Sequence, residues 1–253
     1  MGGDEIGKTG GLTRREWVRL GATFGIGAAA GAFGAYQFGR LLEPPRTLEG
    51  EVRDAIFYEV DGVVPGKPVR VTDFTEWQGV KGVWRGLFVA TPGGHSYVAG
   101  TGFPVLVIRV KRDDAVFSAP SPAELTLPKG FALYYDDPVR DIRIVVAFDR
   151  CTHLCCKAGW HTIPVPAAYR DYIARSPTYE VFGQDPIYCA CHDAQFDPMV
   201  LVKDEHPSGV TYVGAQRVHG PAPRALPVVP VRAEADILIG GMPDPGWYTS
   251  YCR

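Results

Sequence analysis

The sequence has no excess of charge of either sign. Its 26 Lys and Arg residues are balanced by 28 Asp and Glu residues, which gives a formal net charge of −2 at pH 7. Proteins that bind nucleic acid through its phosphates usually concentrate Lys and Arg in a patch or a tail. The balanced composition therefore gives no reason to expect nucleic acid as a partner.

Two common cysteine patterns are missing as well. The chain has no C-x-x-C-H run, which a covalently attached c-type haem requires. It also has no C-x₂-C unit, whereas structural zinc sites usually pair two such units or one unit with H-x₃-H. A C-x-H pair does occur, but it is too tight for the usual zinc knuckle. These absences argue against the commonest haem and zinc sites.

The few cysteines that are present are concentrated in two short stretches. Residues 151–156 read C-T-H-L-C-C and residues 189–192 read C-A-C-H, so that five of the six cysteines and two of the six histidines fall in ten positions. A disulfide framework alone would leave the two histidines without a role. Each stretch offers one Cys and one His as ligands, and Cys156 and Cys191 remain as a matched extra pair. This pattern predicts one metal site.

Two thiolates on one iron and two imidazoles on the other form the ligand set of a Rieske [2Fe–2S] centre. At these residues the sequence resembles the Rieske proteins of the cytochrome bc-type quinol oxidoreductases, whose two boxes read C-T-H-x-G-C and C-x-C-H. The resemblance implies that Cys151 and Cys189 bind the inner iron of one [2Fe–2S] cluster. It implies that His153 and His192 bind the outer iron, where they serve as the catalytic pair.

The same resemblance implies roles for the remaining cysteines of the two boxes. Cys156 and Cys191 would form a disulfide that joins the two cluster-bearing loops. Cys155 and Cys252 are left unassigned, and in an oxidising compartment they can pair with each other. The resemblance is specific in the boxes and much weaker elsewhere, so it covers the site and not its partners.

Three departures from the family pattern change the surroundings expected for the cluster. Cys155 replaces a Gly in a tight loop, Asp193-Ala194 replaces Gly-Ser, and Phe196 corresponds to a Tyr. In the family, the Ser and Tyr hydroxyls donate hydrogen bonds to sulfur, which stabilises the reduced state. Without these hydroxyls, and with the Asp193 carboxylate nearby, we expect a lower reduction potential than ubiquinone-type members have.

A proline-rich segment follows the second box. Residues 220–224 read G-P-A-P-R and are similar to the loop that shields the cluster from water in the family. Proline fixes φ, so Gly220, Pro221 and Pro223 would form a stiff lid. The alternative is a generic linker between strands. Leu154, between the box I ligands, is expected at the docking face.

The N-terminal region predicts export and a membrane anchor. Residues 1–17 would form a cytoplasmic tail whose Arg14-Arg15 pair resembles a twin-arginine signal. The apolar run 18–42 is long enough to span a membrane once, and residues 43–51 would form a proline-containing linker. A cleaved signal peptide is the alternative, although small-residue patterns lie in the middle of the run. The head would lie on the extracytoplasmic, periplasmic side of the cell membrane.

Gly and Pro are frequent in the remainder, 52–253, which favours a mainly β head: an antiparallel β-sandwich with a smaller cluster-binding subdomain over 148–226. A short helix is predicted over 167–175. Alternating or continuous apolar runs predict strands at Val69–Thr72, Leu87–Ala90, Val105–Val110, Ile142–Phe148 and Ala194–Val202, and a final pair within 228–239.

Together these features predict the Rieske subunit of a respiratory bc-like complex. It would take one electron from a quinol, with a proton on a His ligand, and pass the electron to a c-type cytochrome or a copper protein. A cytochrome b-type subunit would be its membrane partner, and the chain would not be catalytic alone. One alternative is the electron-relay small subunit of a periplasmic molybdenum oxidase of arsenite-oxidase type. Another is a soluble Rieske ferredoxin or oxygenase domain, against which the extra cysteine pair and the apolar run count.

Overall fold

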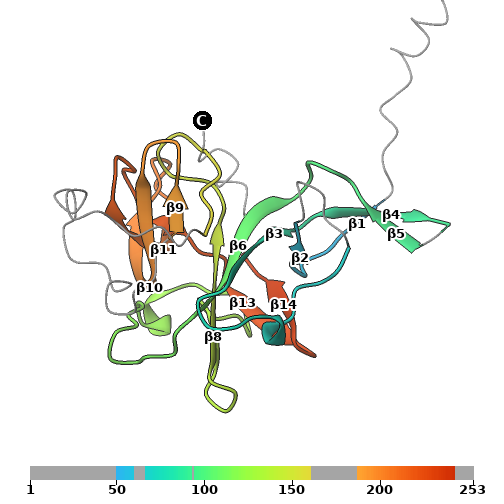
Figure 1. Cartoon of the computed structure of the whole chain (residues 1–253), viewed down its shortest axis with the longest axis horizontal. Helices are drawn as coiled ribbons and strands as arrows, with labels where there is room; N and C mark the ends of the chain where they lie inside the picture. Colours follow the sequence, from blue (N-terminus) through green and yellow to red (C-terminus); the bar gives the residue numbers. More distant parts are fainter. Residues whose placement is uncertain (1–49, 60–65, 93, 161–186, 243–253) are drawn as a thin grey trace, which may run out of the picture. The chain divides into compact units, whose positions relative to one another are not determined.

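A computed structural model describes residues 50–59, 66–92, 94–160 and 187–242 of the chain (Figure 1). The predicted cytoplasmic tail and anchor, most of the linker, and the predicted helix over 167–175 lie outside these residues. None of the helices within the described ranges combines the length and the apolar character needed to cross a membrane.

The described residues are mainly β, and every named strand pairs antiparallel to its neighbours, which confirms this part of the sequence prediction. The helical elements in these ranges are two short 3₁₀ helices, η1 (Val71–Asp73) and η2 (Pro122–Glu124). The strands are β1 (Gly50–Val52), β2 (Phe57–Tyr58), β3 (Gly79–Trp84), β4 (Leu87–Thr91), β5 (Gly94–Tyr97), β6 (Phe103–Val110), β7 (Tyr135–Asp137), β8 (Ile142–Phe148), β9 (Ile187–Cys189), β10 (Ala194–Glu205), β11 (Thr211–His219), β12 (Leu226–Pro227), β13 (Val231–Glu234) and β14 (Ile237–Gly240).

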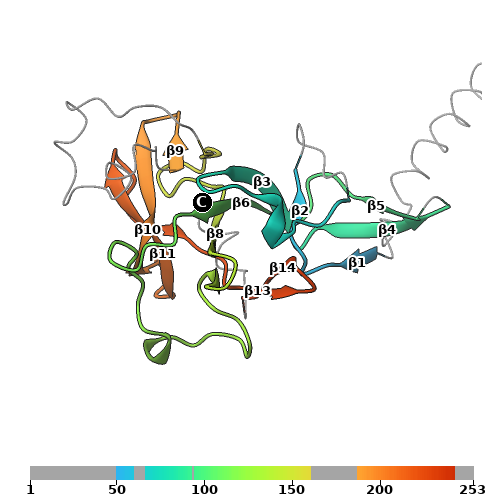
Figure 2. The ribbon, with the colours of Figure 1, turned by 60° about the horizontal axis from the view of Figure 1, so that its bottom comes forward.

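A five-stranded sheet with the order β2-β3-β6-β8-β7 lies at the centre (Figure 2). Successive side chains of a strand point to opposite faces, so β6 and β8 each contribute to two cores. Leu106 and Ile108 of β6 pack in one core, whereas Val105 and Val107 pack in the other, and all four are fully buried. Burial on both faces explains why these strands read as continuous apolar runs.

The two faces of this sheet are covered by different elements. One core joins it to the four-stranded sheet β12-β11-β10-β9, through residues such as Met199 and Leu226. The other core joins it to the hairpin β13-β14, through Val231 and Leu238, and to the segment around η1. The four-stranded sheet is therefore the layer that carries the second cysteine box.

The strand predicted at Val69–Thr72 is wrong. Arg70 makes one isolated bridge to Ile237, and the chain then turns into η1. The Asp73 carboxylate accepts a hydrogen bond from the Arg70 backbone N–H at 3.2 Å, and the Asp73 N–H donates to the Arg70 carbonyl at 3.1 Å. The alternation in the sequence reflects burial, because Val69 and Val71 are fully buried. It does not reflect a ladder of strand hydrogen bonds that continues along the segment. The strands predicted from the other apolar runs are present as β4, β6, β8, β10 and the pair β13-β14.

Candidate metal centre

Strand ends position both cysteine boxes. Strand β8 ends at Phe148, three residues before Cys151, so box I leaves the central sheet directly. Strand β9 ends at Cys189 and β10 begins at Ala194, so the rest of box II forms the turn of a hairpin. Ala194 pairs with Cys189 across that hairpin, which fixes the register of the turn.

Backbone hydrogen bonds close the box I loop on itself. The Cys151 N–H donates to the Cys156 carbonyl at 2.8 Å, and the Cys155 N–H donates to the Cys151 carbonyl at 2.9 Å. Cys155 adopts φ of 62°, the left-handed region that favours glycine. A cysteine therefore occupies a position whose backbone would suit the family's Gly.

The turn in box II has a similar feature at Asp193. This residue has φ of 57°, and its carboxylate accepts a hydrogen bond from the Tyr188 hydroxyl. Tyr188 precedes Cys189 on β9, so the bond ties the two ends of the turn together. The predicted neighbours Ala194 and Phe196 are fully buried, and Phe196 offers no hydroxyl to a sulfur atom.

The thiols of Cys151 and Cys189 lie side by side beneath the loops. Both residues are 1% exposed, neither is in a disulfide, and their sulfur atoms share a hydrogen bond. That bond lowers the pKa of the Cys189 thiol and, together with burial, raises the pKa of Cys151. Each sulfur also accepts two backbone N–H groups of its own loop, from His153 and Leu154 to Cys151 and from Cys191 and His192 to Cys189.

The two imidazoles form a second adjacent pair. The ring centroids of His153 and His192 are 4.7 Å apart with an interplanar angle of 82°. His192 is exposed, whereas His153 is half-buried and its Nδ1 is shielded with no hydrogen-bond partner in the described structure. Leaving such an atom unsatisfied costs about 1–3 kcal/mol, and metal ligation would remove that cost. Two neighbouring thiols and two neighbouring imidazoles fit the ligand set of a [2Fe–2S] cluster.

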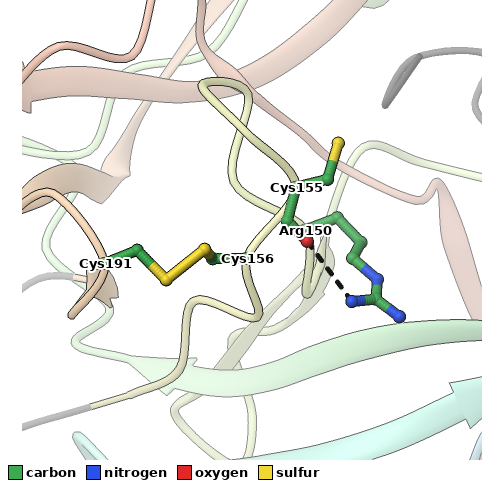
Figure 3. The surroundings of a disulfide bond; sticks show 4 residues. All are labelled: Arg150, Cys155, Cys156 and Cys191. Carbon is green, nitrogen blue, oxygen red and sulfur yellow. Dashed lines mark hydrogen bonds between the residues drawn. A yellow bond between two sulfur atoms is a disulfide. The ribbon is translucent and has the colours of Figure 1, made fainter.

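A disulfide joins the two boxes, as predicted. Cys156 and Cys191 are bonded across a sequence separation of 35, with 6.5 Å between their Cα atoms (Figure 3). Their sulfur atoms and the Cys189 sulfur all lie within 4.8 Å of one another, so the disulfide packs beside a predicted ligand. Cys155 is also disulfide-bonded, and its sulfur points away from the Cys156–Cys191 bond (Figure 3). Its partner, and Cys252, lie outside the described residues.

The proline loop contacts both boxes. The Thr152 hydroxyl of box I donates to the Arg224 carbonyl at 2.7 Å. Gly220 has φ of 81°, and a Cβ there would lie 2.6 Å from the Ala194 Cα that follows box II. Pro221 and Pro223 are exposed. The boxes and the proline loop therefore form three loops in which each is tied to the other two.

The sequence of the boxes does not reveal every contact that shapes the site. Thr152 reaches a residue 72 positions away, which no local pattern reveals. Asp149 is fully buried, neither of its carboxylate oxygens has a hydrogen-bond partner in the described structure, and burial raises its pKa. An acidic residue at the end of the apolar run 142–148 was the available signal. The predicted docking residue Leu154 is 64% exposed.

Comparison of the sequence with protein-family models finds no match, and a search of curated proteins finds no significant match. The interpretation of the site therefore depends on its residues and their arrangement.

Proposed function

We propose that this chain is a membrane-anchored Rieske iron–sulfur subunit that takes one electron from a quinol and passes it to a c-type cytochrome or a copper protein. The observation that supports this most is the pairing of two buried thiols with two adjacent imidazoles on loops joined by a disulfide. It would work beside a cytochrome b-type subunit of a bc-like complex and would not be catalytic alone.

Cys151 and Cys189 would hold one iron of a [2Fe–2S] cluster, and His153 and His192 the other. The bound cluster supplies one-electron redox chemistry whose potential depends on hydrogen bonds to sulfur and on exposure. The amide N–H groups around each thiol favour its negative charge, as ligation requires. Both cysteines are 1% exposed, so little water reaches this pair.

The imidazoles supply the contact with a quinol. The shielded Nδ1 of His153 leaves Nε2 as the ring atom able to meet a hydroxyl group. The exposed ring of His192 offers a second such edge. An imidazole nitrogen can accept the quinol O–H and hold its proton, so a proton and an electron leave the quinol together.

The disulfide and the sequence support an extracytoplasmic compartment. A Cys156–Cys191 bond persists in oxidising surroundings, which supports a head on the extracytoplasmic side of the cell membrane. The predicted anchor over 18–42 and the twin-arginine pair agree with that placement.

Electron paramagnetic resonance (EPR) of reduced membranes that carry the full chain tests this function. We expect a rhombic Rieske signal that shifts when a quinol-site inhibitor is added, and b-type haem that co-purifies with the chain. A signal without an inhibitor response, together with co-purified molybdopterin, would favour the molybdenum-oxidase relay. Absence of the signal would refute both functions.

A further inference from the structure

The bonding state of each box cysteine can be assigned. Five of the six cysteines lie in the two boxes. Four of these five are two free thiols and one bonded pair, namely Cys151 and Cys189, and Cys156 with Cys191. The fifth, Cys155, is disulfide-bonded as well. The boxes therefore contain no cysteine that is left to bond Cys155.

The backbone at Cys155 gives no reason of its own for a cysteine. Its φ is 62°, in the left-handed region that glycine adopts without strain and other residues rarely do. The Cys155 carbonyl accepts a hydrogen bond from Arg150, and its N–H donates to the Cys151 carbonyl, so these bonds do not involve its side chain. The side chain points away from the Cys156–Cys191 disulfide (Figure 3). A bond from its sulfur to a different part of the chain would account for a cysteine at this strained position.

The C-terminal segment is long enough to reach box I. Strand β14 ends at Gly240, and Met242 is the last described residue before Cys252, ten residues later. Ten extended residues span up to about 33–36 Å. The radius of gyration expected for a compact head of roughly 200 residues is about 16 Å, which is about half of this reach. Chain length therefore permits Cys252 to meet box I.

We propose that Cys155 and Cys252 form a disulfide, which ties the C-terminal segment to box I. Consecutive residues of one loop, 155 and 156, then carry bonds to two different parts of the chain. The Cα atoms of bonded cysteines lie about 4.4–6.8 Å apart, so residue 252 lies beside the loop that carries the exposed Leu154. The inference goes beyond the proposed function, because it concerns how the loop is held and does not require a cluster.

Formation of this bond is an oxidation. The two thiols lose two electrons and two protons as one S–S bond forms. Thiol–disulfide exchange with an oxidoreductase that carries a disulfide supplies the step, since that disulfide breaks and both of its sulfur atoms leave as thiols. Bonds of this kind persist in an oxidising, extracytoplasmic compartment.

Peptide mapping of the full chain tests the pairing. The chain is unfolded with a chelator at mildly acidic pH, which suppresses exchange, and is alkylated with N-ethylmaleimide without reductant before digestion by trypsin. Cleavage after Lys and Arg places the box I cysteines in residues 151–157, the box II cysteines in 176–203 and the last cysteine in 233–253. We expect the three peptides as one disulfide-linked species, alkylated only at Cys151 and Cys189.

A variant and a matched control separate the bond from the segment that carries it. Cys252→Ser removes the bond without changing box I, and Ser250→Ala alters the same segment without removing a thiol. In Cys252→Ser, the peptide 233–253 should be released by itself and Cys155 should be alkylated as a third thiol. Its melting temperature should fall by about 5–15 °C relative to Ser250→Ala, because the bond closes a loop of roughly 100 residues.

The outcomes distinguish this inference from the proposed function. Alkylation of Cys155 and Cys252 in the parent chain would overturn the inference, and so would a bond from Cys155 to the same residue of a second copy. Equal melting temperatures of Cys252→Ser and Ser250→Ala would refute a role of the bond in holding the head together. The mapping is done on the unfolded chain, so an absent EPR signal with linked peptides refutes the proposed function alone. A Rieske signal with unlinked peptides refutes the disulfide alone.

Discussion

At the residue scale, four side chains are arranged in two pairs by the loops that carry them. The backbone places the sulfur atoms of Cys151 and Cys189 inside and the rings of His153 and His192 toward the outer edge. Each pair contains one residue from each box, so neither box alone supplies a complete thiol pair or a complete imidazole pair.

Asp193 is expected to lower the reduction potential through its charge. Asp193 follows His192, its carboxylate accepts a hydrogen bond from the Tyr188 hydroxyl, and it forms no ion pair within the described residues. Replacing Asp193 by Asn removes a negative charge beside the site and should raise the midpoint potential, measured by redox titration of the EPR signal. Glu234→Gln, on β13, is the control and should leave the potential unchanged. A fall in the Asp193→Asn potential would contradict the expected role.

The candidate ligands could be predicted from sequence because their residue types are rare and their spacing is dense. The residues around them could not, because their roles depend on long-range contacts. The Thr152 hydroxyl donates a hydrogen bond to the Arg224 carbonyl, 72 positions away in the sequence. The shielding of the His153 Nδ1 depends on how the loops close around it. The replacement of the family's Tyr by Phe196 was visible in sequence, whereas the role of Tyr188 beside Asp193 was not.

At the element scale, the contact between the proline loop and box II depends on Gly220. Replacing Gly220 by Ala places a Cβ 2.6 Å from the Ala194 Cα in a left-handed conformation. Strain and overpacking should together lower the free energy of unfolding by about 2–4 kcal/mol, measured by guanidinium denaturation. Gly209→Ala is the control, because Gly209 has φ of 82° but nothing within 4 Å of the added Cβ. Equal losses in both variants would show that the contact with Ala194 is unimportant.

The disulfide should stabilise the loops more than it contributes to ligation. Replacing Cys156 and Cys191 together by Ser removes a link across 35 residues and should cost about 2–4 kcal/mol of unfolding free energy. The EPR signal should survive incubation of the variant at low temperature, because both predicted cysteine ligands remain. It should be lost at a lower incubation temperature than in the parent chain. Its complete loss at all temperatures would assign these cysteines a more direct role.

The strands could be predicted where an apolar run is long, as in β6 and β8, because burial on both faces leaves a continuous signal. The strand predicted from the short alternating segment 69–72 is absent for a physical reason. Two buried valines on one side satisfy the core whether the chain continues as a strand or turns at Asp73.

At the scale of the whole described head, the central sheet contributes to two cores that support different elements. One core supports the four-stranded sheet that carries box II and receives box I from β8. The other joins the hairpin β13-β14 and contains none of the predicted ligands. The mainly β, antiparallel character could be predicted from composition and apolar runs. The order of strands and the division into two cores could not, because they depend on pairings between distant segments.

Pulsed EPR of the reduced full chain, labelled with ¹⁵N at histidine, tests the central claim most directly. We expect two imidazole nitrogens to couple to the reduced cluster, and either His153→Leu or His192→Leu to abolish the native Rieske signal. A cluster signal without histidine coupling, or an unchanged signal in either variant, would contradict the assignment of these two histidines as ligands.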